Sequence, residues 1–325
     1  MPAVARDVRL SLLDRSRTRA GEPDSAALWH TIRRAKRAEE LGYHRFWVAE
    51  HHAVPGIGSG APTVLMAAVA AATERIRVGS GGVMLPNHQP LVVAEQIGVL
   101  AALHPGRVDL GVGRSLGFTA PVRRALRTDG TDTFREDLDE LRAYLDGTAP
   151  VTVRPRLDAP VPLFVLATGK GLAVAGDLGL PVVVGGPVLD DTPAGGEALA
   201  DYRDRAGDRA YLVVSLDVLV GDPDLALPEA WALAAARTTG EFPPLEPPDP
   251  TRPLSGRQRA TVDAALRRTI VGDEETVAAR LDALVARTGA DELLVSSSTF
   301  DRSALAESDA RLAALLTGTV GHRGS

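Results

Sequence analysis

The 325-residue sequence contains no cysteine, and this absence removes several kinds of chemistry at once. Without a thiol there is no disulfide, no thiolate nucleophile and no cysteine-ligated iron–sulfur cluster. Long apolar runs are missing too, so no segment has the roughly 18 uncharged apolar residues that a membrane span needs. The N-terminal segment alternates in charge and lacks the apolar core of a secretory signal. The sequence therefore predicts a cytoplasmic protein.

Lysine is almost absent as well, since it occurs only at Lys36 and Lys170, and arginine supplies nearly all of the positive charge. Thirty-six basic residues stand against 42 acidic ones, which gives a formal net charge of -6. This balance provides no overall cationic field for nucleic acid or for an anionic membrane surface. We therefore expect neither of them as a partner.

What the chain does contain is a regular alternation of short apolar runs and longer helical patterns. Eight segments have the composition of buried strands: 8–13, 45–49, 76–83, 108–112, 161–167, 181–184, 210–220 and 292–296. Such alternation favours a parallel sheet covered by helices, and eight units favour its closure into a barrel. The proline-rich segment 241–253 is expected to be an inserted loop. The sequence therefore predicts one α/β domain over residues 1–325, a (β/α)8 TIM barrel with insertions in its C-terminal half.

Two adjacent histidines, His51 and His52, follow the predicted strand 45–49. The active site of such a barrel lies at the C-terminal ends of its strands, so this pair is a candidate for the site. Neighbouring strand residues point to opposite faces, which would put one imidazole toward the barrel mouth and the other toward the helices. One interpretation is a single imidazole that acts as acid, base or hydrogen-bond donor. The alternative is a pair of loop histidines with satisfied hydrogen bonds.

A metal site is a weaker alternative, formed by His51 or His52 together with Glu50, His88 and Asp109. A metal needs its ligands on one side, whereas adjacent strand residues diverge. We therefore assign no metal to this chain.

Arg114 ends a glycine-rich turn after the predicted strand 108–112. An arginine beside free backbone N–H groups suits a phosphate, although a salt bridge to a nearby carboxylate is an equal alternative. The glycines at 111, 113 and 117 lack the G-x-G-x-x-G spacing of a dinucleotide-binding unit, and no other segment supplies it. The chain therefore offers no nicotinamide-binding segment of its own.

Glycines also interrupt the predicted strand 76–83, at Gly79, Gly81 and Gly82. Glycine has a low β propensity, so one interpretation is a bulge at the rim of the barrel. The other is a ledge where a flat ligand ring lies against bare backbone.

Several of these segments resemble the luciferase-like flavin monooxygenase family. The resemblance rests on residues 42–52 (GYHRFWVAEHH), 76–90 (IRVGSGGVMLPNHQP), 94–114 (AEQIGVLAALHPGRVDLGVGR) and 271–295 (VGDEETVAARLDALVARTGADELLV). Within that family, the chain is most similar to the stand-alone flavin-dependent oxygenases of actinomycete secondary metabolism. These motifs are specific when taken together, although none is decisive alone.

The resemblance implies a barrel enzyme that binds FMN or, in some branches, a deazaflavin. It implies a monooxygenase that takes reduced flavin from a separate reductase and uses O2 to oxygenate a small organic substrate. His51 would then be the catalytic residue, with a non-prolyl cis peptide between Gly81 and Gly82 under the flavin ring. The expected cofactor-binding residues are Gly81, Gly82, Arg114, Thr168 and Gly169, and the expected substrate-pocket residues are His52, Asn87 and His88. A homodimer through helices 61–73 and 91–103 is also expected.

The middle of the chain departs from the family pattern. Where relatives carry a Gly-Ser-Ser turn or a similar one, this chain has Ala167-Thr168-Gly169, and Gly185-Gly186 replaces an aromatic residue and a histidine. The departure keeps two alternatives open. One is a flavin- or deazaflavin-dependent oxidoreductase that transfers hydride, and the other is a non-catalytic flavin-binding subunit.

Overall fold

Nine parallel strands form one closed sheet in the computed structural model, which describes residues 8–117, 119–128, 130–169 and 171–317. In chain order they are β1 (Arg9–Asp14), β2 (Arg45–Val48), β3 (Arg77–Ser80), β4 (Val83–Met84), β5 (Val108–Gly113), β6 (Leu163–Ala167), β7 (Val182–Val184), β8 (Leu212–Leu216) and β11 (Glu292–Val295). Pairing of β3 with β5 closes the sheet. Because β3 and β4 are two segments of one interrupted strand, the sheet has eight strand positions, which confirms the predicted TIM barrel.

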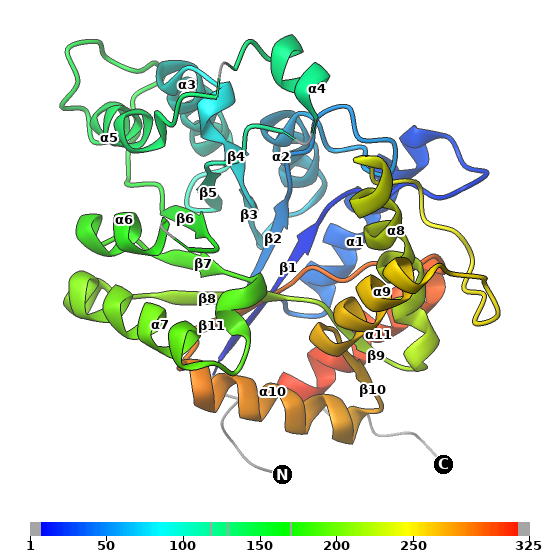
Figure 1. Ribbon diagram of the computed structural model, residues 1–325. Coiled ribbons are helices and arrows are strands. Elements are labelled where there is room, and N and C mark those ends of the chain that lie inside the picture. The colour runs from blue at the N-terminus through cyan, green and yellow to red at the C-terminus, as the bar shows by residue number, and fades with distance from the viewer. Residues whose placement is uncertain (1–7, 118, 129, 170, 318–325) are drawn as a thin grey trace.

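Helices cover the outside of this sheet (Figure 1). They are α1 (Asp24–Glu40), α2 (Pro62–Ala72), α3 (Pro90–Leu103), α4 (Ala120–Ala125), α5 (Phe134–Leu145), α6 (Gly171–Leu178), α7 (Pro193–Ala206), α8 (Leu227–Thr239), α9 (Gly256–Arg268), α10 (Glu274–Thr288) and α11 (Arg302–Thr317). Side-chain caps fix several ends: the Asp273 carboxylate accepts the Thr276 N–H at the start of α10, and Gly289 ends it with a φ of 61°. None of the described helices combines the length and the apolar character that a membrane span requires.

The predicted insertion lies between β8 and β11. After β8 the chain forms β9 (Val218–Val220), then α8, the proline-rich loop, α9 and β10 (Ile270–Gly272). β9 and β10 pair in parallel as a separate two-stranded sheet. Figure 1 shows α8 and α9 together at one side of the barrel, where they extend its rim.

Two predicted strands are divided in the structure. The predicted strand 210–220 breaks at Asp217, whose carboxylate accepts a hydrogen bond from Ser296 Oγ, and its second half leaves the barrel as β9. The predicted strand 76–83 is interrupted at Gly81 and Gly82. α4 is a short helix before α5, and the Thr119 hydroxyl accepts the Val122 N–H at its start.

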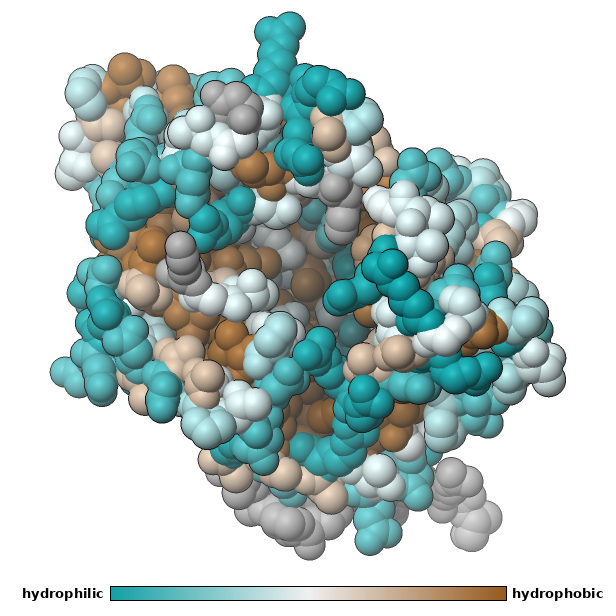
Figure 2. All heavy atoms as spheres, viewed as in Figure 1, coloured by the Kyte–Doolittle hydropathy of each residue, from teal (hydrophilic) through white to brown (hydrophobic). Residues whose placement is uncertain are grey.

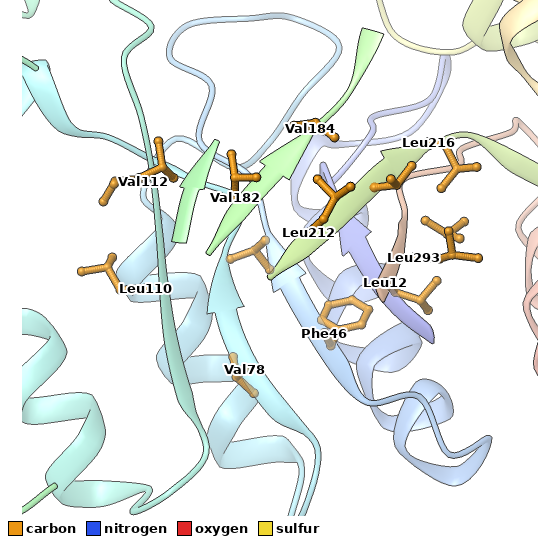
Figure 3. Close-up of a cluster of buried hydrophobic side chains, with 14 of the residues drawn as sticks. Leu12, Phe46, Val78, Leu110, Val112, Val182, Val184, Leu212, Leu216 and Leu293 are labelled. Atoms are coloured by element: carbon orange, nitrogen blue, oxygen red, sulfur yellow. The ribbon is translucent and has the colours of Figure 1, made fainter. Parts of the chain in front are cut away.

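Alternate strand residues build two apolar layers. Outward-facing side chains pack against the helices, and Figure 3 shows Leu12, Phe46, Val182, Leu212 and Leu293 in this layer. The residue that follows each of them points into the barrel. These inward residues form a second cluster: Leu13, Trp47, Val183, Val213 and Leu294, with Phe164. This period of two is what a strand buried on both faces requires.

Below the inner apolar layer, at the N-terminal ends of the strands, lies a buried group of charges that we call the basal ion cluster: Arg45, Arg77, Asp109 and Glu292. Arg45 donates to Glu292 at 3.0 Å and to Asp109 at 2.8 Å, and Arg77 also pairs with Asp109. The two carboxylates are fully buried. Each carboxylate is therefore matched by a guanidinium that stays charged at any physiological pH.

Candidate active site

A hollow of about 540 Å³ opens at the other end of the barrel, at the C-terminal ends of β2 to β8. We call it the central hollow. The space-filling view shows this face hollowed near its middle, with hydrophobic residues at the bottom and hydrophilic side chains around the rim (Figure 2). All of the predicted catalytic and cofactor-binding residues line it, namely His51, Gly81, Gly82, Arg114, Thr168 and Gly169. His52, a predicted substrate-pocket residue, lines it as well. The volume is within the range of small-molecule and cofactor sites.

Glu50 is the best-anchored group of the central hollow, because its side chain is fully buried and accepts three hydrogen bonds. Its Oε1 atom lies 2.5 Å from His52 Nε2 and 2.8 Å from His88 Nε2, and its Oε2 atom accepts the Met84 N–H at 2.8 Å. Burial would raise the pKa of this carboxyl, but the hydrogen bonds from His52 and His88 outweigh burial and hold the pKa at about 2. Glu50 is therefore ionised, and it fixes both imidazoles. We call Glu50, His52 and His88 the mouth cluster.

His51 is partly buried in the wall of the central hollow, and its backbone N–H donates to Ser59 O at 2.9 Å. Burial lowers the pKa of His51 to about 4, and the positive charges of Arg15 and Arg17 act in the same direction. The imidazole is therefore neutral near pH 7, with one nitrogen protonated and the other able to accept a proton. This is the state that a general base or a neutral hydrogen-bonding group needs.

Both histidines line the central hollow, but their rings have different neighbours: His52 contacts Glu50, whereas the charges of Arg15 and Arg17 act on His51. β2 ends at Val48, so His51 and His52 belong to the following loop, where the alternation of a strand no longer applies. Of the predicted substrate-pocket residues, Asn87 and His88 are not among the described residues that line the hollow. His88 contacts Glu50, which lines the hollow, and Asn87 accepts a hydrogen bond from Thr128 at 2.8 Å.

Bare backbone forms one side of the central hollow. The Gly81–Gly82 peptide is cis, as the resemblance implies. A Cβ atom on Gly82 would lie 2.8 Å from Gly111 O, and one on Gly111 would lie 2.2 Å from Ser80 O. No side chain fits between these strands, so the glycines are explained by close backbone approach and leave an unobstructed surface beside the hollow.

Another part of the rim is polar and exposed. Arg114 pairs with Asp132, and both side chains are more than a third exposed. Thr168 and Gly169 are exposed on the loop after β6 and also line the hollow. A surface ion pair of this kind contributes little to stability, so Arg114 can exchange Asp132 for another anion at small cost.

The metal alternative is only partly supported by geometry. Glu50, His52 and His88 place their ligand atoms within 4.8 Å of one another. Asp109 is not with them, because it belongs to the basal ion cluster at the other end of the barrel. In the mouth cluster the imidazole nitrogens make direct hydrogen bonds to the carboxylate, so the atoms that could bind an ion are paired with one another.

The sequence analysis did not single out two charged residues near this site, Arg15 and Glu229. Arg15 directly follows β1 and pairs with Glu229 of α8 at 3.2 Å, and Glu229 also pairs with Arg17 at 2.9 Å. The position of Arg15 after a barrel strand was a usable signal. Glu229 was not predictable, because nothing in its local pattern shows that α8 folds back over the barrel mouth.

Comparison with known proteins identifies the relatives of this barrel. A protein of Bacillus subtilis named YvbT is 38% identical over 320 residues, covering 92% of this chain and 94% of its own. The N-acetyl-S-alkylcysteine monooxygenase of the same organism is 41% identical over 187 residues, which are 54% of this chain and 56% of its own. The crystal structure of apo-MsnO8 superposes with a TM-score of 0.80 at 31% identity, covering 96% of this chain and 98% of that one. The family model of the luciferase-like monooxygenases matches residues 8–292, and the chain belongs to that family of flavin-dependent enzymes.

Proposed function

We propose that this protein is an FMN-dependent monooxygenase that receives reduced FMN from a separate reductase and oxygenates a small organic substrate with O2. The observation that carries the proposal is the convergence of neutral His51, the bare Gly81–Gly82 backbone and Arg114 on one hollow of about 540 Å³. Secondary metabolism is the setting that the sequence resemblance suggests.

The residues of the central hollow fit FMN in shape and in charge. The backbone at Gly81 and Gly82 offers a surface free of side chains for a flat ring. Arg114, Thr168 and Gly169 offer a guanidinium, a hydroxyl and backbone N–H groups for the phosphate. When bound, reduced FMN would supply the electrons for the activation of O2.

The side chains of the chain itself would position the substrate and move the proton. His51, neutral and half-enclosed, can accept a proton at one ring nitrogen and donate from the other. Glu50 keeps the His52 ring against the wall of the central hollow by a direct contact to Nε2. His51 is the proposed acid–base residue, and Glu50 is a positioning residue that acts through His52.

We also propose a homodimer through α2 and α3. Val64, Val92, Val99 and Leu103 of these helices are exposed, by 70%, 43%, 48% and 69%. Large apolar side chains that cluster on neighbouring helices are typical of a protein interface. Sedimentation analysis of the wild type and of the double variant Val64→Asp/Leu103→Asp tests this, with a dimer expected for the first and a monomer for the second.

An anaerobic titration with reduced FMN, followed by rapid mixing with air-saturated buffer, tests the proposed function. We expect micromolar or tighter binding and an absorbing species that forms only in the presence of O2. Products should then be sought in a panel of organic compounds. Thioethers belong in this panel because one relative is an N-acetyl-S-alkylcysteine monooxygenase.

Other outcomes would favour the alternatives. Binding of FMN or a deazaflavin with substrate oxidation that continues without O2 would indicate hydride transfer. Binding without any turnover would indicate a non-catalytic subunit. Stoichiometric metal in the purified protein, with activity lost on chelation, would indicate that the mouth cluster holds a metal for a hydrolase.

A further inference from the structure

A second cavity of about 630 Å³ lies beside the central hollow, between the barrel rim and the inserted helices α8 and α9. We call it the side slot. Its floor includes Arg15 after β1 and Ser297 and Ser298 after β11. The sequence gives no sign of it, because its walls come from segments far apart along the chain.

Much of the wall of the side slot is apolar. Ala230 and Leu233 of α8 face it from one side, and Ala260 and Ala264 of α9 from the other, with Phe242 from the proline-rich loop. The small side chains of both helices leave room between them. An apolar space of this volume fits the hydrocarbon part of a medium-sized organic molecule.

Some charged side chains of the side slot already form ion pairs within the protein, and others do not. At the floor, Glu229 is matched by Arg15 and Arg17, and at the edge Arg268 is matched by Asp190 at 2.8 Å. Arg237 and Arg257 also line the slot, are exposed, and have no ion pair or side-chain hydrogen bond to any residue that the structure describes. The rim therefore carries two cations with no internal partner above apolar walls.

The floor of the side slot lies close to the proposed catalytic residue. Ser59 joins them: its carbonyl accepts the His51 N–H, and its hydroxyl donates to Arg15 O at 3.2 Å. A third hollow shares Ser215 and Gly185 with the central hollow, and Asp217 and Arg268 with the side slot. The two cavities therefore adjoin along the rim between β7 and β8.

We infer that the side slot binds the substrate, and that the substrate is an amphipathic organic anion. Its carboxylate or similar group would pair with Arg237 and Arg257, and its apolar body would extend between α8 and α9 toward His51. The assignment of the slot to the substrate depends on the proposed function, but its preference for an amphipathic anion does not.

Calorimetric titration with octanoate and with octanamide, its uncharged counterpart, tests the inference in the protein without flavin. The double variant Arg237→Gln/Arg257→Gln should bind octanoate about tenfold more weakly and octanamide within about twofold of the wild type, because two exposed ion pairs are lost. Ala264→Phe, which narrows the slot, should weaken both ligands. Arg259→Gln is the matched control, since Arg259 is exposed on α9 and does not line the slot.

Separate titrations with FMN distinguish failure of this inference from failure of the proposed function. Arginine-dependent octanoate binding that is unchanged by bound FMN supports the side slot, even if no oxygenase activity is found. Octanoate that does not bind at millimolar concentration overturns the inference. Equal affinity in the wild type and the double arginine variant, or displacement of octanoate by FMN, overturns it as well.

Discussion

Two buried carboxylate clusters lie at opposite ends of the same barrel, and they differ in the side chains that neutralise them. In the basal ion cluster, Asp109 and Glu292 are matched by arginines. In the mouth cluster, Glu50 is matched by two histidines and one backbone N–H. A guanidinium never loses its proton in a protein, whereas an imidazole can gain and lose one near neutral pH. The first arrangement can only stabilise the fold, while the second can also take part in proton chemistry.

The position of each cluster agrees with this division. In TIM barrels generally, the C-terminal face of the strands carries the active site and the N-terminal face contributes to stability. The apolar layer around Trp47 and Phe164 separates the two clusters. Substitutions in the basal ion cluster should therefore act on unfolding alone, whereas substitutions at the barrel mouth should also act on catalysis or binding.

Asp109→Asn should give the largest effect, and it should act on stability. The substitution removes the carboxylate partner of Arg77 and one of the two carboxylate partners of Arg45, and breaking a buried pair costs about 3–5 kcal/mol. The free energy of unfolding in urea measures it. The control is Asp139→Asn, which removes an exposed pair with Arg135 and should cost less than about 1 kcal/mol. Equal effects of the two substitutions would contradict the structural role of the basal ion cluster.

His51→Gln should act on catalysis instead. Loss of a positioned acid–base group lowers turnover by about 100-fold or more, while the free energy of unfolding should change by less than about 1 kcal/mol. Because the pKa of His51 is about 4, the wild-type rate should not change with His51 ionisation between pH 6 and 8. His104→Gln, at the end of α3 far from the hollow, is the control. Turnover that survives in His51→Gln would remove the residue from the mechanism.

The sequence could predict the barrel and the composition of the central hollow but not the pairing of its charges. Hydrophobic periodicity locates the strands, and residues that follow strands are brought together by closure of the sheet, which is why His51, Gly82 and Arg114 meet as expected. The two histidine partners of Glu50 come from two separate loops, and their contacts depend on side-chain packing. The side slot depends on how α8 and α9 fold over the rim, and local pattern carries no information about that.

Glu50→Gln should change how stability depends on pH. A carboxyl whose pKa is lowered on folding stabilises the protein above its unfolded pKa, and this contribution is lost as the pH falls toward the folded value of about 2. Between pH 5 and pH 3 the wild type should lose about 2 kcal/mol more of its free energy of unfolding than Glu50→Gln. Urea unfolding at each pH measures this. The control is Glu197→Gln, since Glu197 is exposed on α7, and its free energy of unfolding should change with pH as that of the wild type does. The same pH dependence in Glu50→Gln would show that Glu50 is not a strongly stabilised carboxylate.

Arg114→Gln should have the smallest effect, confined to the phosphate of the cofactor. Arg114 is 41% exposed and its present partner is Asp132, so a phosphate contact there should be worth about tenfold in FMN affinity. Riboflavin, which lacks the phosphate, should bind the wild type and the variant equally. Asp132→Asn frees the guanidinium and should tighten FMN severalfold, whereas Arg124→Gln on α4 should leave both ligands unchanged. If Arg114→Gln weakened the binding of FMN and riboflavin alike, Arg114 would shape the hollow and not bind phosphate. The exposed rim would then resemble the basal ion cluster, because it would act on structure alone.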